Sequence, residues 1–244
     1  TNNREWDDFV YQKDKGCIFQ LSAWKKIVEK SYKHRPLFLI ARKKGTVVGL
    51  LPMFILKSNF YKKTLVSMPF VPHSGICSDS EKVTQKLIDK AIDLAKQSGV
   101  KYLEIRNSTP SLSDKLLTSD TYKSSVIKLP KTYNDFIYKV IRKNKRKTIQ
   151  KSLKTGLTVS WTKNISNFFS IYTENMRNLG SPGHSKDFFV NITKELPNNA
   201  IVQEVRKEDK VIYSAFYLFY KKRMINVWSS SIAEARNLYA TDFG

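Results

Sequence analysis

Apolar positions in the first half of the chain predict helices that alternate with short strands. Residues 22–32 carry apolar side chains at helical spacing, and Ser22 is a suitable N-cap. Residues 80–98 repeat that spacing and are followed by a glycine, a residue typical of helix C-termini. Two β-rich runs meet at Lys44-Gly45, which predicts a hairpin. The runs predicted to form strands are residues 37–43, 46–56, 63–71, 101–107 and 124–130.

The second half repeats this alternation after a stretch of basic residues. A predicted basic helix leads through Gly156 into a strand, and two further helices end at Gly180 and Pro197. The longest run, residues 211–220, has apolar side chains on both faces, so we expect it at the centre of a sheet. The runs predicted to form strands are residues 157–161, 200–207, 211–220 and 224–232.

This order predicts a mixed α/β (α+β) fold with two similar domains. We expect the first domain at residues 1–130, a basic connecting helix at 131–156, and the second domain at 157–244. Residues 235–244 carry helix-forming residues and an apolar pattern, but the sequence offers them no partner to pack on. We therefore expect the second domain to be incomplete within this sequence.

Composition narrows the classes of partner. The formal net charge of +22 should attract nucleic acid, acidic lipid headgroups or nucleotide-linked substrates, although lysine-rich surfaces also serve solubility alone. No apolar run approaches the roughly 18–20 residues of a membrane helix, and the start of the chain lacks a signal-peptide pattern. Cys17 and Cys77 form neither a CxxC pair nor a Cys/His cluster, so we expect buried thiols and no metal site.

The basic stretch is the most unusual feature of the sequence. Eight cations and no acid lie between Lys139 and Lys154. On a helix, like charges at i,i+4, such as Arg142 with Arg146, cost about 0.2–0.5 kcal/mol per pair, which implies an anion that relieves the repulsion. We expect Arg142 and Arg146 to hold a phosphate between the domains, with Lys145 beside them, because arginine binds phosphate bidentately.

Removing the two arginines should then weaken substrate binding with little loss of stability. The competing interpretation is a solvated connecting helix. Its apolar side would be a buried stripe formed by Phe136, Ile137, Val140, Ile141, Ile149 and Leu153.

The segment "NLGSPGHS" predicts a tight loop between two helices. Simple helix termination explains its glycines and proline. The functional alternative is that the loop presents Arg177 to a substrate and His184 as a proton acceptor.

Five segments, which together span nearly the whole chain, carry a resemblance to a known family. They are "FQLSAWKKIVEKSYKHRPLFLIARKKGTVVGLLPMF", "LVSMPFVPHSGI", "YLEIRN", "IRKNKRKTIQKSLKTGLTV" and "NMRNLGSPGHSKDFF". In this order they resemble the Fem family of aminoacyl and peptidyl transferases, whose members are built from tandem GNAT-like acyltransferase domains. The resemblance is strongest to the FemAB-like subfamily associated with exosortase (PEP-CTERM) systems, although "HSG" departs from the aromatic residue and paired glycines expected in one loop.

The resemblance implies a transferase that joins an activated acyl or aminoacyl group to an amine of a cell-envelope, peptidoglycan or exopolysaccharide precursor. The acceptor would be a nucleotide- or lipid-linked anion and the donor an aminoacyl-tRNA or an acyl thioester, with no bound cofactor. The place of action would be the cytoplasm, with peripheral contact at the inner membrane face. In GNAT-like folds the acyl donor lies in a slot between the middle strands, where Trp228 and Ser230 would bind substrate and Tyr217 would join His184 as a catalytic residue.

Two other functions stay open at this point. An acyl-CoA-dependent GNAT N-acyltransferase is disfavoured because no Arg/Gln-x-x-Gly-x-Gly/Ala turn follows a middle strand to hold the CoA pyrophosphate. A non-catalytic binder of RNA or of anionic membranes would also use the excess of positive charge, and its affinity would fall steeply with salt.

Overall fold

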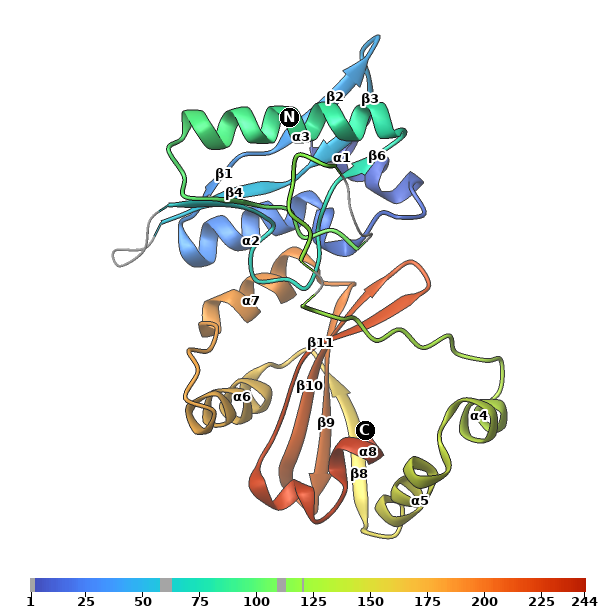
Figure 1. Cartoon of the computed structure of the whole chain (residues 1–244). Helices are drawn as coiled ribbons and strands as arrows, with labels where there is room; N and C mark the ends of the chain where they lie inside the picture. Colours follow the sequence, from blue (N-terminus) through green and yellow to red (C-terminus); the bar gives the residue numbers. More distant parts are fainter. Residues whose placement is uncertain (1–2, 58–62, 109–112, 120) are drawn as a thin grey trace. The chain divides into compact units, whose positions relative to one another are not determined.

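The structure is a computed structural model, and it describes residues 3–57, 63–108, 113–119 and 121–244. The chain divides into two compact units: unit 1 comprises residues 1–121 and 194–197, and unit 2 comprises residues 122–193 and 198–244 (Figure 1). Both units mix helices with β-sheets, so the prediction of a mixed α/β fold is confirmed.

Unit 1 contains two small sheets and three α-helices in its described part. One sheet has the strand order β1-β4-β5-β7 and the other the order β2-β3-β6. Strand β7 returns parallel to β5 after helix α3, whereas the other paired strands of the unit are antiparallel. The elements are α1 (Asn3–Gln12), a 3-10 turn (Ile18–Gln20), α2 (Ser22–Tyr32), β1 (Arg35–Pro36), β2 (Leu39–Lys43), β3 (Thr46–Leu51), β4 (Met53–Leu56), β5 (Thr64–Ser67), β6 (Cys77–Ser78), α3 (Glu81–Gln97) and β7 (Leu103–Glu104).

The turn residues of unit 1 act as the sequence predicts. Lys44 and Gly45 have φ angles of 49° and 85°, and strands β2 and β3 pair across them as an antiparallel hairpin. Gly99 follows α3 with a φ of 60°, a conformation in which glycine carries no steric cost. The predicted strand at 46–56 is divided at Pro52. Strand β3 ends before this proline and β4 begins after it, and the two strands belong to different sheets.

The N-terminus of α2 is capped differently from the sequence prediction. Ser22 is the first helical residue rather than the N-cap. The carboxylate of Asp7, on α1, accepts hydrogen bonds from the Ser22 backbone N–H at 2.6 Å and from its hydroxyl at 2.7 Å. Burial raises the pKa of Asp7, and the two hydrogen bonds from Ser22 oppose that rise. Asp7, which lies 15 residues before Ser22 in the sequence, therefore supplies the hydrogen-bond acceptor that the residues next to the helix start do not provide.

This cap leads to a test of the local fold. Asp7→Ala should lower the free energy of unfolding of unit 1 by about 1–2 kcal/mol, because the Ser22 N–H loses its acceptor in a partly buried place. Asp7→Asn keeps one oxygen acceptor and should lose less than half of that amount. Urea unfolding of the two variants measures the difference, and equal losses would contradict the capping role.

Unit 2 is built on one four-stranded antiparallel sheet with the order β11-β10-β9-β8. Strand β10 is central, as the sequence predicts, and it pairs with β9 and β11 over most of its length. Its register with β11 shifts between Phe216 and Tyr217, which marks a bulge. The elements are α4 (Tyr133–Asp135), a π-helical turn (Phe136–Val140), α5 (Lys143–Ser152), β8 (Leu157–Thr162), α6 (Ser166–Asn178), α7 (Lys186–Glu195), β9 (Ala200–Lys207), β10 (Lys210–Tyr220), β11 (Arg223–Ser231), a 3-10 turn (Ala233–Arg236) and α8 (Ala240–Phe243).

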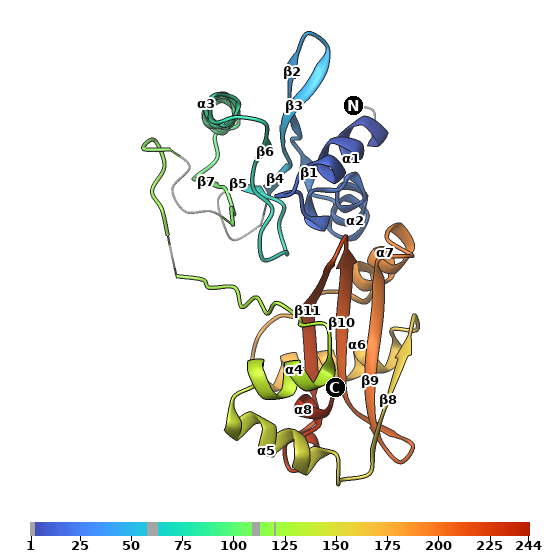
Figure 2. The same cartoon turned by 90° about the vertical axis from the view of Figure 1, so that its right-hand side faces the viewer.

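The two faces of this sheet carry different cores. Helix α6 covers one face, and α5 and α8 lie on the other (Figures 1 and 2). Aromatic rings fill the α6 face; they belong to Phe168, Tyr172, Phe188, Phe189, Phe216 and Trp228. The α8 face is lined mainly by aliphatic residues together with one tyrosine, namely Leu157, Val205, Ile212, Tyr213, Ala215, Ala235 and Ala240.

Two predictions about chain segments are wrong. Residues 124–130 form no strand, and their apolar side chains Val126, Ile127 and Leu129 are exposed. The C-terminal residues do have a packing partner, since Ala235 and Ala240 are buried in the core on the α8 face and α8 packs on β10. The sequence could not show either outcome, because both depend on contacts between distant segments.

The predicted basic helix is interrupted. Thr132 caps α4 by accepting a hydrogen bond from the Asp135 N–H at 3.1 Å, and the π-helical turn ends at Val140. Ile141 and Arg142 then adopt extended conformations, and α5 begins at Lys143. Unit 2 therefore presents its basic residues on two short helical pieces with a break between them.

Candidate functional site

The break places the N-terminus of α5 at a basic surface pocket. This pocket has a volume of about 470 Å³ and is lined by Arg142, Lys143, Asn144, Lys145 and Thr148. Arg142 is the N-cap residue, and no side chain caps this end of the helix. The first backbone N–H groups of a helix carry partial positive charge and bind anions, so the helix end and its basic side chains favour the same kind of ligand.

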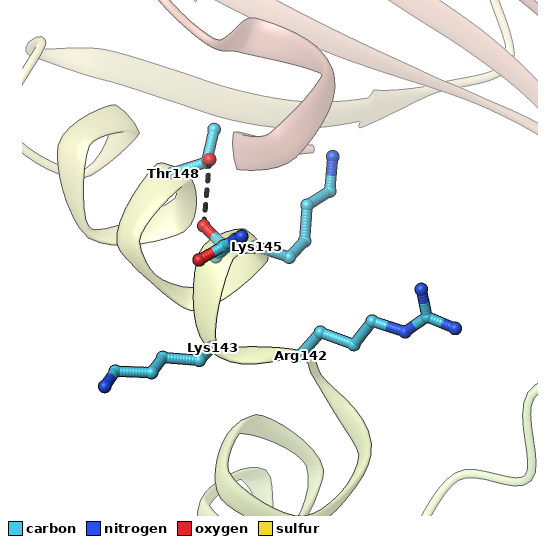
Figure 3. A pocket seen from close by; sticks show the side chains of 5 residues that line it. Arg142, Lys143, Lys145 and Thr148 are labelled. Carbon is cyan, nitrogen blue, oxygen red and sulfur yellow. Dashed lines mark hydrogen bonds between the residues drawn. The ribbon is translucent and has the colours of Figure 1, made fainter.

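The side chains of this pocket do not converge. Figure 3 shows Arg142 and Lys143 leaving the backbone in opposite directions, while Lys145 extends toward a neighbouring helix. Lys145 forms an ion pair with Asp242 of α8. Thr148 donates its hydroxyl to the Asn144 carbonyl at 3.2 Å within α5. Arg142 and Lys143 are thus the two cations of this pocket that have no partner among the described residues.

Four of the eight cations of the basic stretch have partners within the protein. Lys139 pairs with Asp135 at 2.6 Å, Lys145 pairs with Asp242, and the Lys151 ammonium lies 5.7 Å from the centre of the Tyr239 ring. Arg146 is the fourth. Among the described residues we find no partner for the other four, which are Arg142, Lys143, Lys147 and Lys154.

Arg146 does not form the predicted clamp with Arg142. Its Nη1 donates to the backbone carbonyls of Ile137, Tyr138 and Ile141, at 3.3, 3.0 and 3.0 Å. The guanidinium also lies 5.7 Å from the centre of the Tyr138 ring. These carbonyls lie in the π-helical turn and at the break, so Arg146 holds the break together and is not among the residues that line the pocket.

The predicted apolar stripe of the basic helix is also wrong. Val140 and Leu153 are exposed, and Ser152 is the buried residue of α5. The interruption at Ile141 rotates the two helical pieces relative to one another, so the six apolar residues no longer share one face. The interruption also leaves Arg142 at the N-cap position rather than inside the helix. The predicted i,i+4 repulsion between Arg142 and Arg146 is therefore absent.

A second pocket lies between α6 and the loop that follows it. It has a volume of about 250 Å³ and brings Arg177 and His184 together, as the functional alternative for the loop requires. Its other lining residues are Phe169, Thr173, Met176, Ser181 and Gly183. Gly183 lies so close to α6 that an added Cβ would meet Tyr172 at 3.1 Å and Met176 at 3.3 Å. A larger residue at this position would require the Tyr172 and Met176 side chains to shift by a few tenths of an ångström.

His184 is part of the aromatic core of the α6 face. Its ring centre lies 4.5 Å from that of Phe188 and 5.8 Å from that of Trp228. Its backbone N–H donates to the Tyr172 hydroxyl at 2.9 Å. Burial lowers the pKa of His184 to about 4, so the imidazole is neutral at pH 7 and a weak base. The structure thus gives His184 a packing role and leaves its catalytic role a prediction.

The residues predicted to line the donor slot lie on opposite faces of the sheet. Trp228 pairs with Phe216 in the register and contacts the aromatic residues of the α6 face, and Ser230 accepts a hydrogen bond from Asn175 of α6 at 3.4 Å. Tyr217 instead packs with the core of the α8 face. Its ring lies 5.6 Å from Trp161, and burial raises its pKa to about 12. Tyr217 and Trp228 therefore cannot line one side of the same slot.

Sequence reasoning missed several residues that share surfaces with the predicted ones. Lys143 and Asn144 line the first pocket, Met176 the second, and Trp161 is half exposed beside Tyr217. The sequence contains one signal of the helix arrangement that exposes these residues. Thr132 stands three residues before Asp135, and this capping pattern predicts a separate helix that starts ahead of the basic stretch.

Other classes of site receive no support in the described part of the chain. No group of three or more His, Cys, Asp or Glu side chains there is arranged to hold a metal ion. Cys17 and Cys77 are both buried and are not joined in a disulfide. None of the helices in the described residues has the length and apolar character needed to cross a bilayer.

Comparisons with known proteins identify the fold. No protein-family model matches this chain, and no curated protein matches it either. The crystal structure of FemX matches 100% of this chain and 82% of its own, with a TM-score of 0.68 and 14% sequence identity. The C-terminal domain (DUF2156) of a protein named as a lysylphosphatidylglycerol synthetase, from Agrobacterium fabrum, matches 98% of this chain and 71% of its own, with a TM-score of 0.54 and 12% identity. At these identities the likeness shows the fold alone, and that fold is Fem-like.

Proposed function

We propose that this protein is an aminoacyl or acyl transferase that acts on an amine-bearing component of the cell envelope. The observation that carries the proposal is the Fem-like fold, which matches FemX over the whole chain. The second structural neighbour is named as a synthetase of lysylphosphatidylglycerol, a molecule in which an aminoacyl group, lysyl, is attached to the lipid phosphatidylglycerol. Both the tandem GNAT-like arrangement and the exosortase-associated subfamily belong to this proposal as expectations from the sequence.

The basic pocket at α5 supports an anionic substrate. Arg142 and Lys143 are exposed beside a helix N-terminus that no side chain caps. A phosphate there would accept hydrogen bonds from the backbone N–H groups and would neutralise the two cations. Nucleotide-linked and lipid-linked precursors both carry such phosphates, and so does tRNA, which makes this pocket the proposed anchor for the substrate.

The proposed reaction is aminolysis of an activated acyl group. The nitrogen of the acceptor amine attacks the ester carbonyl of the donor, a C–N bond forms, and the C–O bond to the donor breaks. The proton lost by the amine goes to the departing 3′-oxygen when the donor is an aminoacyl-tRNA, so a strongly basic side chain is not required. The protein would supply alignment of the two substrates and stabilisation of the oxyanion. This chemistry fits the low basicity of His184 at its pKa of about 4.

The anchor makes a kinetic prediction. In Arg142→Gln/Lys143→Gln, the KM for the anionic substrate should rise about ten-fold while kcat changes less than three-fold, because the lost interactions lie away from the reacting atoms. The matched control is Lys147→Gln/Lys154→Gln, which removes the same charge from the same stretch outside the pocket. Steady-state kinetics with an aminoacyl donor and a phosphate-linked amine measure both, and an equal rise in KM in the two variants would contradict a specific anchor.

A second candidate, an acyl-CoA-dependent N-acyltransferase, lacks a supporting observation in the structure. It would require a backbone cradle for the CoA pyrophosphate, and the sequence after the middle strands does not contain one. A thermal-shift titration with CoA separates the two candidates when it is repeated on Arg142→Gln/Lys143→Gln, since only the acyl-CoA enzyme predicts stabilisation by CoA that persists without the phosphate anchor.

A further inference from the structure

The segment of residues 122–133 joins exposed apolar side chains to lysines. No helix or strand forms between Lys123 and Thr132, and Figures 1 and 2 show the segment as an uncoiled ribbon that leads into α4. Five large apolar residues in it are between 57% and 94% exposed: Tyr122, Val126, Ile127, Leu129 and Tyr133. Folded proteins seldom leave so many neighbouring apolar side chains in water without a partner for them.

The charge of the segment is of one sign. Lys123, Lys128 and Lys131 alternate with the apolar residues, and no acid occurs from Tyr122 to Asn134. The basic stretch of α5 follows directly, with Arg142, Lys143, Lys147 and Lys154 lacking partners in the described chain. A partner that complements this segment must therefore be apolar in its interior and negative at its surface.

We propose that residues 122–133 form a membrane-docking segment that lies in the interface of an anionic bilayer. Tyrosine side chains favour the level of the headgroups, where their rings are apolar and their hydroxyls remain hydrated. The aliphatic side chains of Val126, Ile127 and Leu129 enter the upper acyl region, and the lysines reach anionic headgroups. The backbone stays at the interface, because a chain without internal hydrogen bonds cannot enter the hydrocarbon core.

An anionic bilayer accounts for the exposed apolar side chains and the lysines together, whereas a polyanion in solution accounts for the lysines and tyrosines alone. RNA would bind the lysines and would stack on the tyrosines, but it offers nothing to the exposed valine, isoleucine and leucine. The inference goes beyond the proposed transferase function and does not depend on it, since it concerns where the protein is held rather than which bond it makes. Its test measures membrane binding alone, so either proposal can fail without the other.

The experiment is co-sedimentation of the full chain with lipid vesicles. Vesicles of phosphatidylcholine with about one third phosphatidylglycerol should bind the protein, and vesicles of phosphatidylcholine alone should bind it at least ten-fold less. In Val126→Ser/Ile127→Ser/Leu129→Ser, which keeps every lysine, the partition coefficient should fall at least ten-fold at low and at high salt. The matched control, Leu153→Ser/Val159→Ser/Leu179→Ser, removes exposed apolar side chains elsewhere in unit 2 and should bind like the wild type.

The lysines are tested separately. Lys123→Gln/Lys128→Gln/Lys131→Gln should weaken binding by about five-fold per lysine at low salt and much less at high salt. The control with the same charge change is Lys163→Gln/Lys186→Gln/Lys222→Gln, at exposed positions outside the segment. Absence of vesicle binding, or full binding by the serine variant, would overturn the proposal. The four variants are expected to have similar melting temperatures, because every substituted side chain is exposed. Similar melting temperatures would show that a loss of binding is not caused by a loss of folding.

Discussion

Arg146→Ala is expected to lower the free energy of unfolding of unit 2 by about 2–3 kcal/mol. Its Nη1 donates to three backbone carbonyls, those of Ile137, Tyr138 and Ile141, which the helix break leaves without helical donors. Without the guanidinium these carbonyls would accept hydrogen bonds only from water, and the π-helical segment would lose the side chain that fixes it to α5. The sequence alone predicts that removal of this arginine costs little stability, and the three hydrogen bonds reverse that expectation.

The matched control is Arg142→Ala. Arg142 lies four residues away, is exposed, and has no partner among the described residues, so its loss should change stability by less than about 0.5 kcal/mol. Arg146→Lys should fall between the two, because an ammonium can reach one carbonyl but cannot bridge three. Hydrogen exchange of the amides from Phe136 to Ser152 gives a local readout, and equal exchange in the two alanine variants would contradict the bracing role.

Acid should destabilise unit 2 through His184. Burial lowers its pKa to about 4 in the folded protein, whereas the unfolded chain has an ordinary histidine pKa near 6.5. Between these two values the unfolded state binds a proton that the folded state does not bind, so stability falls as the pH is lowered. The stability is fully present above about pH 6.5, and about 2–3 kcal/mol of it is lost once the pH is below 4, after allowance for partial exposure of the ring.

The variant His184→Phe isolates this effect. A phenyl ring keeps the contacts with Phe188 and Trp228 but cannot take up a proton. The difference in unfolding free energy between wild type and variant should therefore shrink or reverse as the pH falls from 7 to 4, because only the wild type loses the histidine contribution. Urea unfolding followed at several pH values measures it. Parallel pH curves for the two proteins would show that His184 is not held neutral by its surroundings.

The elements predicted well from the sequence are those with strong local patterns. Helices α2, α3, α6 and α7 and the sheet of unit 2 follow from apolar spacing and from glycines such as Gly156 and Gly180, both of which adopt positive φ. The predicted strand at 124–130 has the right composition but no neighbour to pair with, and pairing is a tertiary property. The interruption at Ile141 contains neither proline nor glycine, and the hydrogen bonds that hold it come from Arg146 in the next helix.

The candidate site was predictable by residue type but not by geometry. The basic stretch and the loop of Arg177 and His184 were found from composition, and the structure shows each beside a pocket. Which cations are already engaged depends on Asp135, Asp242 and Tyr239, and the last two are distant in sequence. Tyr217 and Trp228 lie on opposite faces because Trp228 pairs with Phe216, and successive side chains of a strand point to opposite faces of the sheet.

The break between the π-helical turn and α5 has a consequence for the charge that the basic stretch presents to solution. Lys139, Lys145, Arg146 and Lys151 each have a partner within the protein. Among the described residues, the uncompensated charge of the stretch is therefore carried by Arg142, Lys143, Lys147 and Lys154, which are half of the eight cations that the composition alone would count.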